Sequence, residues 1–390
     1  MDTSSTSTHG SGPVGASAWV TVDLDAIRDN VAELDRRAGN AQVMAVVKAD
    51  GYGHGLVPSA RAALAGGATW LGVAQLAEAL RLRAAGITAP ILTWLFVPGA
   101  DVAAAIDVGV DVTVGSAWTL DAVRAAAAER GRPVRVQVKV DTGLGRGGVL
   151  EDWSQMVAAL AAAQADGAVE VTGVWSHFAW ADAPDHPTVR AQQERFRDAC
   201  DELERAGIRP PLRHLANSAA TLTNPSAHFD LVRPGIAVYG VSPVPDLGGP
   251  ADFGLREAMR VTARLSLVKA ARAGQGVSYG HEYVTASDTV LGLVPMGYAD
   301  GLPRSAGGRG PVAVGGRALT VAGRICMDQF VLDLGDGYAG GAGDEVTILG
   351  RAADGEPSAE DWARAAGTIS YEIVTRMGPR LPRVLVGGGG

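Results

Sequence analysis

The chain has 390 residues, of which 47% are hydrophobic and 19% charged, and its formal net charge is −8. This length usually exceeds a single hydrophobic core, so we expect two domains, and the composition is that of a globular enzyme, not of a disordered or fibrous chain. The negative charge argues against nucleic acid or an anionic membrane surface as the main partner, and the absence of a spanning stretch and of a secretion signal favours a cytoplasmic protein.

Both ends of the chain are predicted to be disordered, flexible tails. Residues 1–16 are rich in Ser, Thr and Gly without an aliphatic run, and residues 387–390 are all Gly. Cys200 and Cys326 are the only cysteines, too few for a disulfide framework or a thiolate metal site.

The first regular element after the N-terminal tail is predicted to be a helix. Asp23 is a residue type that caps helix N-termini, and the segment behind it is rich in helix-forming residues. Its apolar residues recur at helical spacing, so one face should pack on the domain that follows. These residues are Leu24, Ile27, Val31 and Leu34.

Between residue 43 and about residue 240, short β-branched runs alternate with Ala-rich segments of helical length. This alternation is typical of repeated βα units around a parallel sheet, and the eight predicted strands are the number of a (β/α)8 barrel. The strands cover residues 43–48, 70–74, 91–95, 111–115, 134–140, 169–177, 213–217 and 229–233. We assign residues 17–254 to this barrel.

After about residue 255 the pattern changes to short alternating strands separated by Gly-rich turns. Such a pattern predicts an antiparallel meander or small barrel. We therefore expect an α/β plus all-β protein, an N-terminal (β/α)8 barrel followed by a C-terminal β-domain of residues 255–386.

Polar residues follow directly after the predicted barrel strands, where catalytic groups lie in this fold. The first strand ends in KADGYGHG (48–55), which places Lys48 at the rim of an apolar barrel mouth. Burial there would lower the pKa of the amine and make it a nucleophile toward an aldehyde. A surface lysine that happens to follow a strand is the alternative, but the alternating glycines favour a backbone that turns tightly near a bound group.

A second candidate site follows the last predicted strand. That strand ends at Arg233, and Pro234, Gly235 and Ile236 then open a short helix whose free N–H groups would bind an anion. Ser218, after the seventh strand, can add a hydroxyl. A phosphate site between these two loops recurs in barrels of this kind, whereas a simple turn is the alternative.

The motif KADGYGHG resembles the cofactor-lysine motif of the alanine racemases. Further blocks resemble that family in the same order: DTGLGRGG (141–148), WSHFA (175–179), HLANSAAT (214–221), VRPGIAVYG (232–240), VSYGHEY (277–283), GYADG (297–301), GRICMDQ (323–329) and TISYEI (368–373). The resemblance covers about residues 18–383. It implies an isomerase that uses pyridoxal 5'-phosphate to interconvert L- and D-alanine and supplies D-alanine for bacterial peptidoglycan.

The resemblance also implies a site shared between two subunits. Removing a proton from one face of the substrate Cα and returning it to the other requires two acid/base groups. In the family, the residue matching Lys48 holds the cofactor as a Schiff base and is one base, and the residue matching Tyr279 is the other, supplied by the second subunit of a head-to-tail homodimer. A phenol is a poor base at neutral pH, and His177, linking Tyr279 toward Arg233, would lower its pKa.

Three more cationic side chains acquire roles from the resemblance. Arg233 would face the pyridine nitrogen of the cofactor, and because it keeps its proton, the ring would be a weaker electron sink than with a carboxylate partner. Arg146 would contact the cofactor phenolic oxygen and the substrate carboxylate. Lys139 corresponds to a lysine that is carbamylated in many members, and a carbamate would relieve its repulsion by Arg146.

The remaining candidates surround the cofactor and the substrate. By resemblance, the cofactor would also be bound by Tyr52, Asn217, Ser218, Gly235, Ile236 and Tyr371, and the partner chain would supply Met327, Tyr298 and Asp328 to the entrance and the substrate wall. A snug pocket penalises each extra methylene by about 1–3 kcal/mol, which favours alanine. His214 and His281 receive no role, and the seven histidines are not spaced as metal ligands.

Three other classes of protein share parts of this pattern. Pyridoxal-phosphate-dependent decarboxylases carry a cysteine-containing C-terminal motif that is missing here. Pyridoxal-phosphate carrier proteins consist of a lone barrel without a β-domain. Broad-specificity racemases are typically exported, and the lack of a signal peptide argues against that class.

Overall fold

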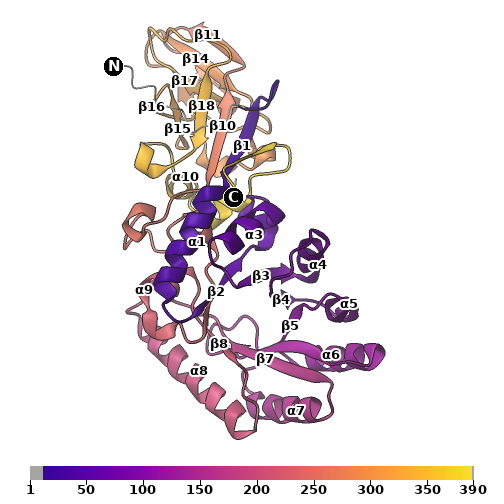
Figure 1. Ribbon diagram of the computed structural model, residues 1–390. Helices are drawn as coiled ribbons and strands as arrows, with labels where there is room; N and C mark the ends of the chain where they lie inside the picture. Colours follow the sequence, from indigo (N-terminus) through magenta and orange to yellow (C-terminus); the bar gives the residue numbers. More distant parts are fainter. Residues whose placement is uncertain (1–11, 389–390) are drawn as a thin grey trace, which may run out of the picture. The chain divides into compact units, whose positions relative to one another are not determined.

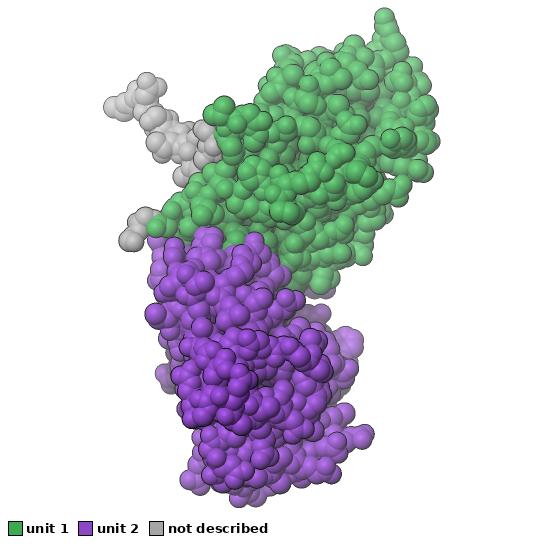
Figure 2. All heavy atoms as spheres, turned by 90° about the vertical axis from the view of Figure 1, so that its right-hand side faces the viewer, with its two compact units in different colours: residues 1–26, 52–55, 256–390 green, residues 27–51, 56–255 purple. Residues whose placement is uncertain are grey.

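The computed structural model describes residues 12–388 (Figure 1). Residues 1–11 and 389–390, which make up most of the predicted N-terminal tail and half of the predicted C-terminal one, lie outside the described residues. The described chain forms two compact units, shown in different colours in Figure 2. We call residues 27–51 and 56–255 the barrel unit, and residues 12–26, 52–55 and 256–388 the β unit.

The barrel unit is built on one parallel sheet with the strand order β8-β7-β6-β5-β4-β3-β2-β9. The strands are β2 (Gln42–Val46), β3 (Trp70–Gln75), β4 (Ile91–Leu95), β5 (Asp111–Val114), β6 (Val134–Lys139), β7 (Val169–Trp175), β8 (Leu212–His214) and β9 (Leu231–Val232). Near the seam, the N–H of Asp230 donates to the carbonyl of Arg213 at 3.0 Å, so the sheet is nearly closed. The predicted (β/α)8 barrel is confirmed.

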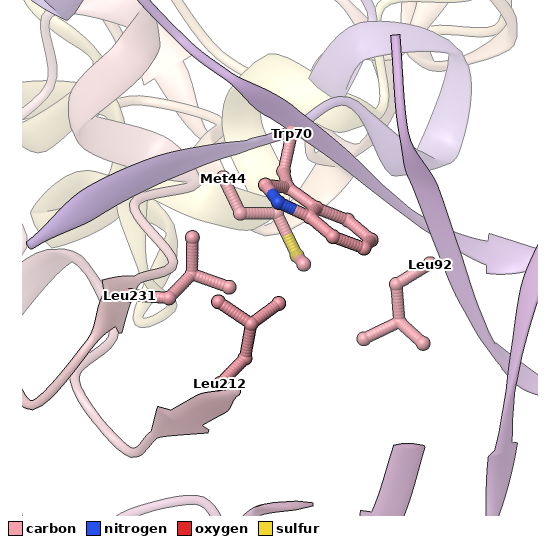
Figure 3. Packing of buried hydrophobic residues seen from close by; sticks show 5 residues of the cluster. All are labelled: Met44, Trp70, Leu92, Leu212 and Leu231. Atoms are coloured by element: carbon pink, nitrogen blue, oxygen red, sulfur yellow. The ribbon is translucent and has the colours of Figure 1, made fainter. Parts of the chain in front are cut away.

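Apolar side chains from both halves of this sheet meet inside it. Figure 3 shows five of them pointing toward one another, and each is at most 6% exposed. They are Met44 on β2, Trp70 on β3, Leu92 on β4, Leu212 on β8 and Leu231 on β9. Burial of side chains of this size contributes about 1.5–3 kcal/mol each, so the cluster holds the strands on which the site is built.

Helices on the outer side of the strands cover the barrel sheet (Figure 1). They are α1 (Leu24–Ala38), α3 (Leu56–Ala65), α4 (Leu76–Ala84), α5 (Val102–Asp107), α6 (Ala117–Arg130), α7 (Trp153–Ala165), α8 (Pro187–Arg205) and α9 (Ser218–Thr223), with the 3-10 turns η1 (Pro225–Ala227), η2 (Ile236–Tyr239) and η3 (Pro250–Phe253). The side chain of Asp23 accepts a hydrogen bond from the N–H of Ala26 at 2.9 Å and caps α1, as predicted. Ile27, Val31 and Leu34 on its predicted face are fully buried.

The β unit contains three sheets, with the strand orders β16-β15-β18-β10-β1-β19, β11-β14-β17 and β12-β13. The strands are β1 (Ala18–Asp23), β10 (Met259–Arg264), β11 (Leu267–Ala271), β12 (Gly276–Val277), β13 (Tyr283–Val284), β14 (Thr289–Val294), β15 (Pro311–Val314), β16 (Arg317–Thr320), β17 (Phe330–Asp333), β18 (Glu345–Leu349) and β19 (Arg383–Val386). Turns and short helices connect them: η4 (Tyr279–His281), η5 (Tyr298–Asp300), η6 (Arg304–Ala306), η7 (Ala352–Asp354), α10 (Ala359–Ala366) and α11 (Ser370–Thr375). The predicted C-terminal β-domain is confirmed.

One strand of the β unit comes from the other end of the chain. β1 pairs antiparallel with β10 and parallel with β19, so the strand that precedes α1 lies in the sheet of the C-terminal region. The sequence analysis did not predict this strand. None of the helices in residues 12–388 combines the length and the apolar composition that a membrane crossing requires.

Candidate active site

Lys48 follows β2, where the backbone turns with an unusual handedness. Residues 49–53 all have positive φ, between 52° and 81°, although three of them carry side chains. The left-handed region costs a residue with a side chain about 1–2 kcal/mol. A hydrogen bond from the N–H of Ala49 to the Glu78 carboxylate, 2.7 Å long, helps to hold this segment, which together with Lys48 forms the short turn α2 (Lys48–Tyr52). The predicted tight turn is thus a left-handed one.

The amine of Lys48 lies among aromatic and charged groups. Its Nζ is 5.8 Å from the centre of the Trp94 ring, at the end of β4. Burial, and then the charge of Arg146, lowers the pKa of Lys48, and the carboxylate of Glu78 opposes this shift. A lowered pKa increases the fraction of neutral amine, which is the form that attacks a carbonyl carbon.

Two further cations lie over the ring of Trp175 at the end of β7. The Nζ of Lys139 is 4.7 Å from the ring centre, and the guanidinium carbon of Arg233 is 4.9 Å from it. Burial, followed by the charges of Arg146 and Arg233, lowers the pKa of Lys139 to about 8. Burial lowers the pKa of Arg233 to about 9, which leaves the guanidinium protonated at neutral pH.

The loop that carries Arg146 is wound around a buried carboxylate. Asp141 accepts hydrogen bonds from the N–H groups of residues 143–146, at 2.9 to 3.2 Å. Burial raises the pKa of Asp141, but these backbone donors outweigh it and the pKa is lowered. At Gly148, with φ of +119°, a side chain would come within 2.9 Å of the Asp141 backbone nitrogen. The loop therefore depends on Asp141 and on glycine, and Arg146 itself stays exposed in the single chain.

Arg233 connects two histidines. Its Nη2 donates to the carbonyl of Ser176 at 2.7 Å and lies 3.3 Å from His177 Nδ1, while its Nη1 lies 3.1 Å from His214 Nδ1. Burial, and then the charge of Arg233, lowers the pKa of both histidines well below the ordinary value. Both rings therefore accept hydrogen bonds from Arg233 as neutral imidazoles.

The predicted anion site lies between the ends of β8 and β9. The hydroxyl oxygen of Ser218 accepts hydrogen bonds from the N–H of Gly235 at 2.7 Å and from the N–H of Ala237 at 3.3 Å. Asn217 caps α9 by accepting from the N–H of Ala220 at 3.1 Å. Backbone donors at the start of η2, which begins at Ile236, thus converge on one buried polar point.

The β unit presents several of its candidate residues to solvent. Tyr279 is 72% exposed, Met327 53% and Tyr298 37%. Tyr279 lies in a strained turn in which the flanking Ser278 has φ of +61°. The Tyr279 side chain is therefore mostly accessible from solvent in the single chain.

The other β-unit candidates are held within that unit. Asp328 forms an ion pair with Arg380 at 2.8 Å, and both side chains are about half exposed. The rings of Tyr52 and Tyr371 lie 6.4 Å apart at 49°. Burial, and then the neighbouring Tyr371, raises the pKa of Tyr52, so its hydroxyl remains a hydrogen-bond donor at neutral pH.

Some residues of this region were missed by the sequence analysis. They are Trp94, Asp111, Gln137, Asp141, Trp175 and His214. Asp141, Trp175 and His214 lie in quoted motifs, where their position after a strand or at its end was a usable signal. The others sit inside predicted strands or close to their ends, where a single sequence does not distinguish a core residue from a site residue. No group of three or more His, Cys, Asp or Glu side chains in residues 12–388 is arranged to hold a metal ion.

Fold and site together define a (β/α)8-barrel enzyme whose chemistry centres on a partly buried lysine surrounded by cations. The family model of the alanine racemase N-terminal domain matches residues 22–243, and that of the C-terminal domain matches residues 258–385. This chain belongs to the alanine racemase family.

Individual relatives support the same assignment over nearly the whole length. The alanine racemase of Frankia casuarinae is 59% identical over 93% of this chain and 94% of its own length, and that of Thermobifida fusca is 58% identical over 95% and 98%. The crystal structure of alanine racemase from the D-cycloserine producer Streptomyces lavendulae has a TM-score of 0.95 and 58% identity, covering 97% of this chain and 98% of its own. The Bacillus anthracis enzyme with bound L-Ala-P has a TM-score of 0.88 and 36% identity, covering 97% of each chain.

Proposed function

We propose that the protein is a cytoplasmic pyridoxal-phosphate-dependent alanine racemase, which interconverts L- and D-alanine and supplies D-alanine for peptidoglycan. It acts as a homodimer whose sites are each completed by the second subunit. The relatives that match nearly the whole chain carry the name of this activity. The observation that carries the proposal within this chain is the excess of positive charge at the carboxyl ends of the barrel strands.

The donor set fits a cofactor and a substrate that are both anionic. Burial, and then the charge of Arg146, lowers the pKa of both Lys48 and Lys139, and the charge of Arg233 lowers that of Lys139 further, while the Asp141 carboxylate is engaged by backbone N–H groups. Several positive charges gathered in one partly buried site favour the binding of anionic groups there. A phosphate, a phenolic oxygen and a substrate carboxylate supply such anions.

The phosphate would be held at the start of η2. The N–H of Ile236 and the hydroxyl hydrogen of Ser218 would donate to it. Gly235, whose N–H donates to Ser218 Oγ, would fix that hydroxyl, and Asn217 shapes the adjacent helix N-terminus. Tyr52 and Tyr371 would add phenolic donors. Arg233 would face the pyridine nitrogen, and Arg146 would bind both the phenolic oxygen and the substrate carboxylate.

When bound, pyridoxal phosphate supplies the aldehyde that reacts with an amine and the ring that spreads the negative charge of a deprotonated Cα. Lys48 holds or removes the proton on one face of that carbon. Tyr279 of the partner subunit does so on the other face, with His177 as its neighbour. Met327, Tyr298 and Asp328 of the partner subunit would wall off the site and limit the space beyond the substrate methyl.

Lys139 has a separate role in this proposal. Because its pKa is lowered to about 8, a minor but much increased fraction of its amine is neutral near physiological pH and able to add carbon dioxide. The resulting carbamate would be an anionic partner for Arg146 and would replace a repulsive pair by an attractive one.

The small number of lysines makes a decisive test possible, since the chain contains only Lys48, Lys139 and Lys269. We expect the purified protein to show the absorbance of a lysine–pyridoxal adduct and to interconvert L- and D-alanine. Reduction with borohydride should fix the pyridoxyl group covalently on Lys48. Lys48→Ala should lose the absorbance and the activity, while Lys269→Ala, at an exposed position on β11, should keep both. Absorbance without racemisation, or labelling on Lys139, would contradict the proposal.

A further inference from the structure

A continuous chain of buried hydrogen bonds crosses the barrel interior and ends on Arg233. Asp111 on β5 accepts from Gln137 Nε2 on β6 at 3.1 Å, Gln137 Oε1 lies 2.7 Å from His214 Nε2 on β8, and His214 Nδ1 lies 3.1 Å from Arg233 Nη1. None of the four residues is more than 5% exposed. We call Asp111, Gln137 and His214 the relay.

The donors and acceptors allow only one arrangement of protons in the relay. Asp111 is paired with Arg135 at 2.7 Å, so its carboxylate accepts and Gln137 must turn its amide nitrogen toward it. The amide oxygen of Gln137 then faces His214 and can only accept. His214 must therefore carry its proton on Nε2 and offer the lone pair of Nδ1 to the guanidinium of Arg233.

The backbone is shaped to hold Gln137 in this place. A side chain at Gly173, on the neighbouring β7, would come within 2.9 Å of the Gln137 amide carbon, so glycine makes room for it. The register between β6 and β7 shifts at Gln137 and passes over Thr172, whose hydroxyl donates to Asp111 at 2.6 Å. Gly173, the register shift and the Thr172 hydroxyl thus hold Asp111 and Gln137, the first half of the relay, in place.

The second half of the relay is fixed by stacking. The ring of His214 lies parallel to that of Trp175, with 5.9 Å between centres and 8° between planes. Among the described residues, the hydrogen bonds of the Arg233 guanidinium go to four neutral acceptors, the carbonyls of Ser176 and Leu215 and the two histidines. The relay does not neutralise the charge of Arg233, because Gln137 and His214 separate the Asp111 carboxylate from the guanidinium.

We propose that the relay positions Arg233, by locking His214 as a neutral Nε2–H tautomer that accepts from the guanidinium and orients it toward the cofactor ring. This inference rests on the proposed function, because it assigns Arg233 to the pyridine nitrogen. Asp111, Gln137 and His214 are positioning residues, since they act through Arg233. The lowered pKa of His214, caused by burial and then by Arg233, keeps its ring neutral.

The test uses three variants of the holoenzyme. Gln137→Met removes both hydrogen bonds at similar volume, and His214→Phe keeps the stacking on Trp175 but removes the acceptor. His214→Asn places an amide oxygen near the former Nδ1 and should rescue Arg233. Gln193→Met is the control, because Gln193 lies on the outer helix α8 and the change removes a partly buried hydrogen bond to Ser226, 2.9 Å long.

We expect Gln137→Met and His214→Phe to shift the absorbance maximum of the bound cofactor, to raise the ratio of transamination to racemisation, and to lower kcat about tenfold with little change in KM. His214→Asn should restore most of each property, and Gln193→Met should change none of them. Unchanged spectra and ratios in both relay variants, in a wild type that racemises alanine, would overturn the proposal.

A second readout does not depend on activity. In holoenzyme labelled with ¹⁵N-histidine, the His214 signals, identified by their loss in His214→Asn, should report a neutral Nε2–H ring from about pH 6 to pH 9. Gln137→Met should allow the other tautomer. A protonated ring or an Nδ1–H tautomer in the wild type would overturn the relay, whereas failure of the wild type to racemise alanine would overturn the proposed function and leave this measurement valid.

Discussion

The barrel unit and the β unit expose their candidate residues very differently. In the barrel unit, Arg233 is 5% exposed and is held by several hydrogen bonds, and Lys48 and Lys139 are partly buried beside aromatic rings. In the β unit, Tyr279 is 72% exposed and Met327 53%. The barrel residues are thus oriented by their own unit, whereas these β-unit side chains face solvent in the single chain.

The difference in exposure between the two sets of candidate residues also affects the stability of the chain. Burying the Arg233 guanidinium among neutral acceptors costs free energy, so the barrel site should be sensitive to the loss of any supporting contact. An exposed side chain contributes little to the stability of its own chain, and its replacement usually changes stability by less than about 0.5 kcal/mol. Replacing an exposed candidate residue of the β unit should therefore change activity without changing stability, whereas replacing a buried one in the barrel unit should change both.

The largest expected effect is that of Tyr279→Phe. In the proposed mechanism Tyr279 is the second acid/base group, so we expect racemisation to fall by about 10²–10⁴-fold when its hydroxyl is removed, while the cofactor absorbance and the melting temperature stay unchanged. Activity assays, absorbance spectra and thermal unfolding check the three parts. Tyr283→Phe, which removes a hydroxyl bonded to Asp333 at 2.7 Å in the same region, is the control and should keep most of the activity.

Mixing inactive variants tests whether the site is shared between subunits. When Lys48→Ala and Tyr279→Phe chains are unfolded together and reassembled, one of the two sites in each mixed dimer is intact, so about a quarter of the wild-type activity should return. If verified mixed dimers showed no activity, Tyr279 would act within its own chain. The high exposure of the β-unit residues would then not indicate a site shared between subunits.

The next effect concerns the charge of Arg233. We expect Arg233→Glu to lower racemisation by about a hundredfold and to raise the transamination side reaction, because a carboxylate partner allows the pyridine nitrogen to be protonated and strengthens the electron sink. Product analysis by chromatography measures both. Arg209→Glu, at a 77% exposed side chain, is the control for the charge change. If Arg233→Glu gave no additional transamination, the assignment of Arg233 to the ring nitrogen would be wrong.

Lys139 should show a modification that depends on pH. Burial, followed by Arg146 and Arg233, lowers the pKa of this amine to about 8, so the neutral form that reacts with carbon dioxide increases as pH rises through 8 and is lost as pH falls. At fixed dissolved carbon dioxide, the fraction of protein heavier by one carbon dioxide should follow the same direction in native mass spectra. Lys139→Met should abolish the added mass and lower activity about tenfold.

Lys269→Met is the matched control for this modification. Lys269 is exposed on β11, and its replacement should leave both the added mass and the activity unchanged. Added mass that persists in Lys139→Met would locate the modification elsewhere, and a carbamate fraction that grows as pH falls would contradict the role given to the lowered pKa.

The sequence predicted those parts of the fold that depend on local pattern. The eight barrel strands and the cap of α1 at Asp23 follow from alternation, spacing and residue type, which a single sequence displays. β1 was missed because its burial comes from pairing with β10 and β19, more than 200 residues away along the chain. Long-range pairing leaves no mark on local periodicity.

The site divides in the same way. Lys48 and Arg233 were predicted as site residues because strand ends mark catalytic positions in this fold, and the family resemblance then suggested the exposed Tyr279. Gln137 and Trp175 lie within strands, where their contacts depend on which side chains the closed sheet brings together. Their roles become visible only in three dimensions, because any polar or aromatic residue in a strand has the same appearance in the sequence.

The smallest expected effect is at Asp328 in the β unit. Its ion pair with Arg380 joins two side chains that are 58% and 52% exposed, and such pairs contribute about 0–1 kcal/mol. Asp328→Asn should therefore leave the free energy of unfolding, measured with denaturant, within that range, and any activity change should appear in KM. Arg380→Gln should be more destabilising, because it also deprives Asp300, only 6% exposed, of a partner at 3.2 Å. Equal losses of unfolding free energy in both variants would mean that Asp328 is held by its own chain as firmly as the barrel residues are. The proposal that the β unit offers Asp328 to a second subunit would then be wrong.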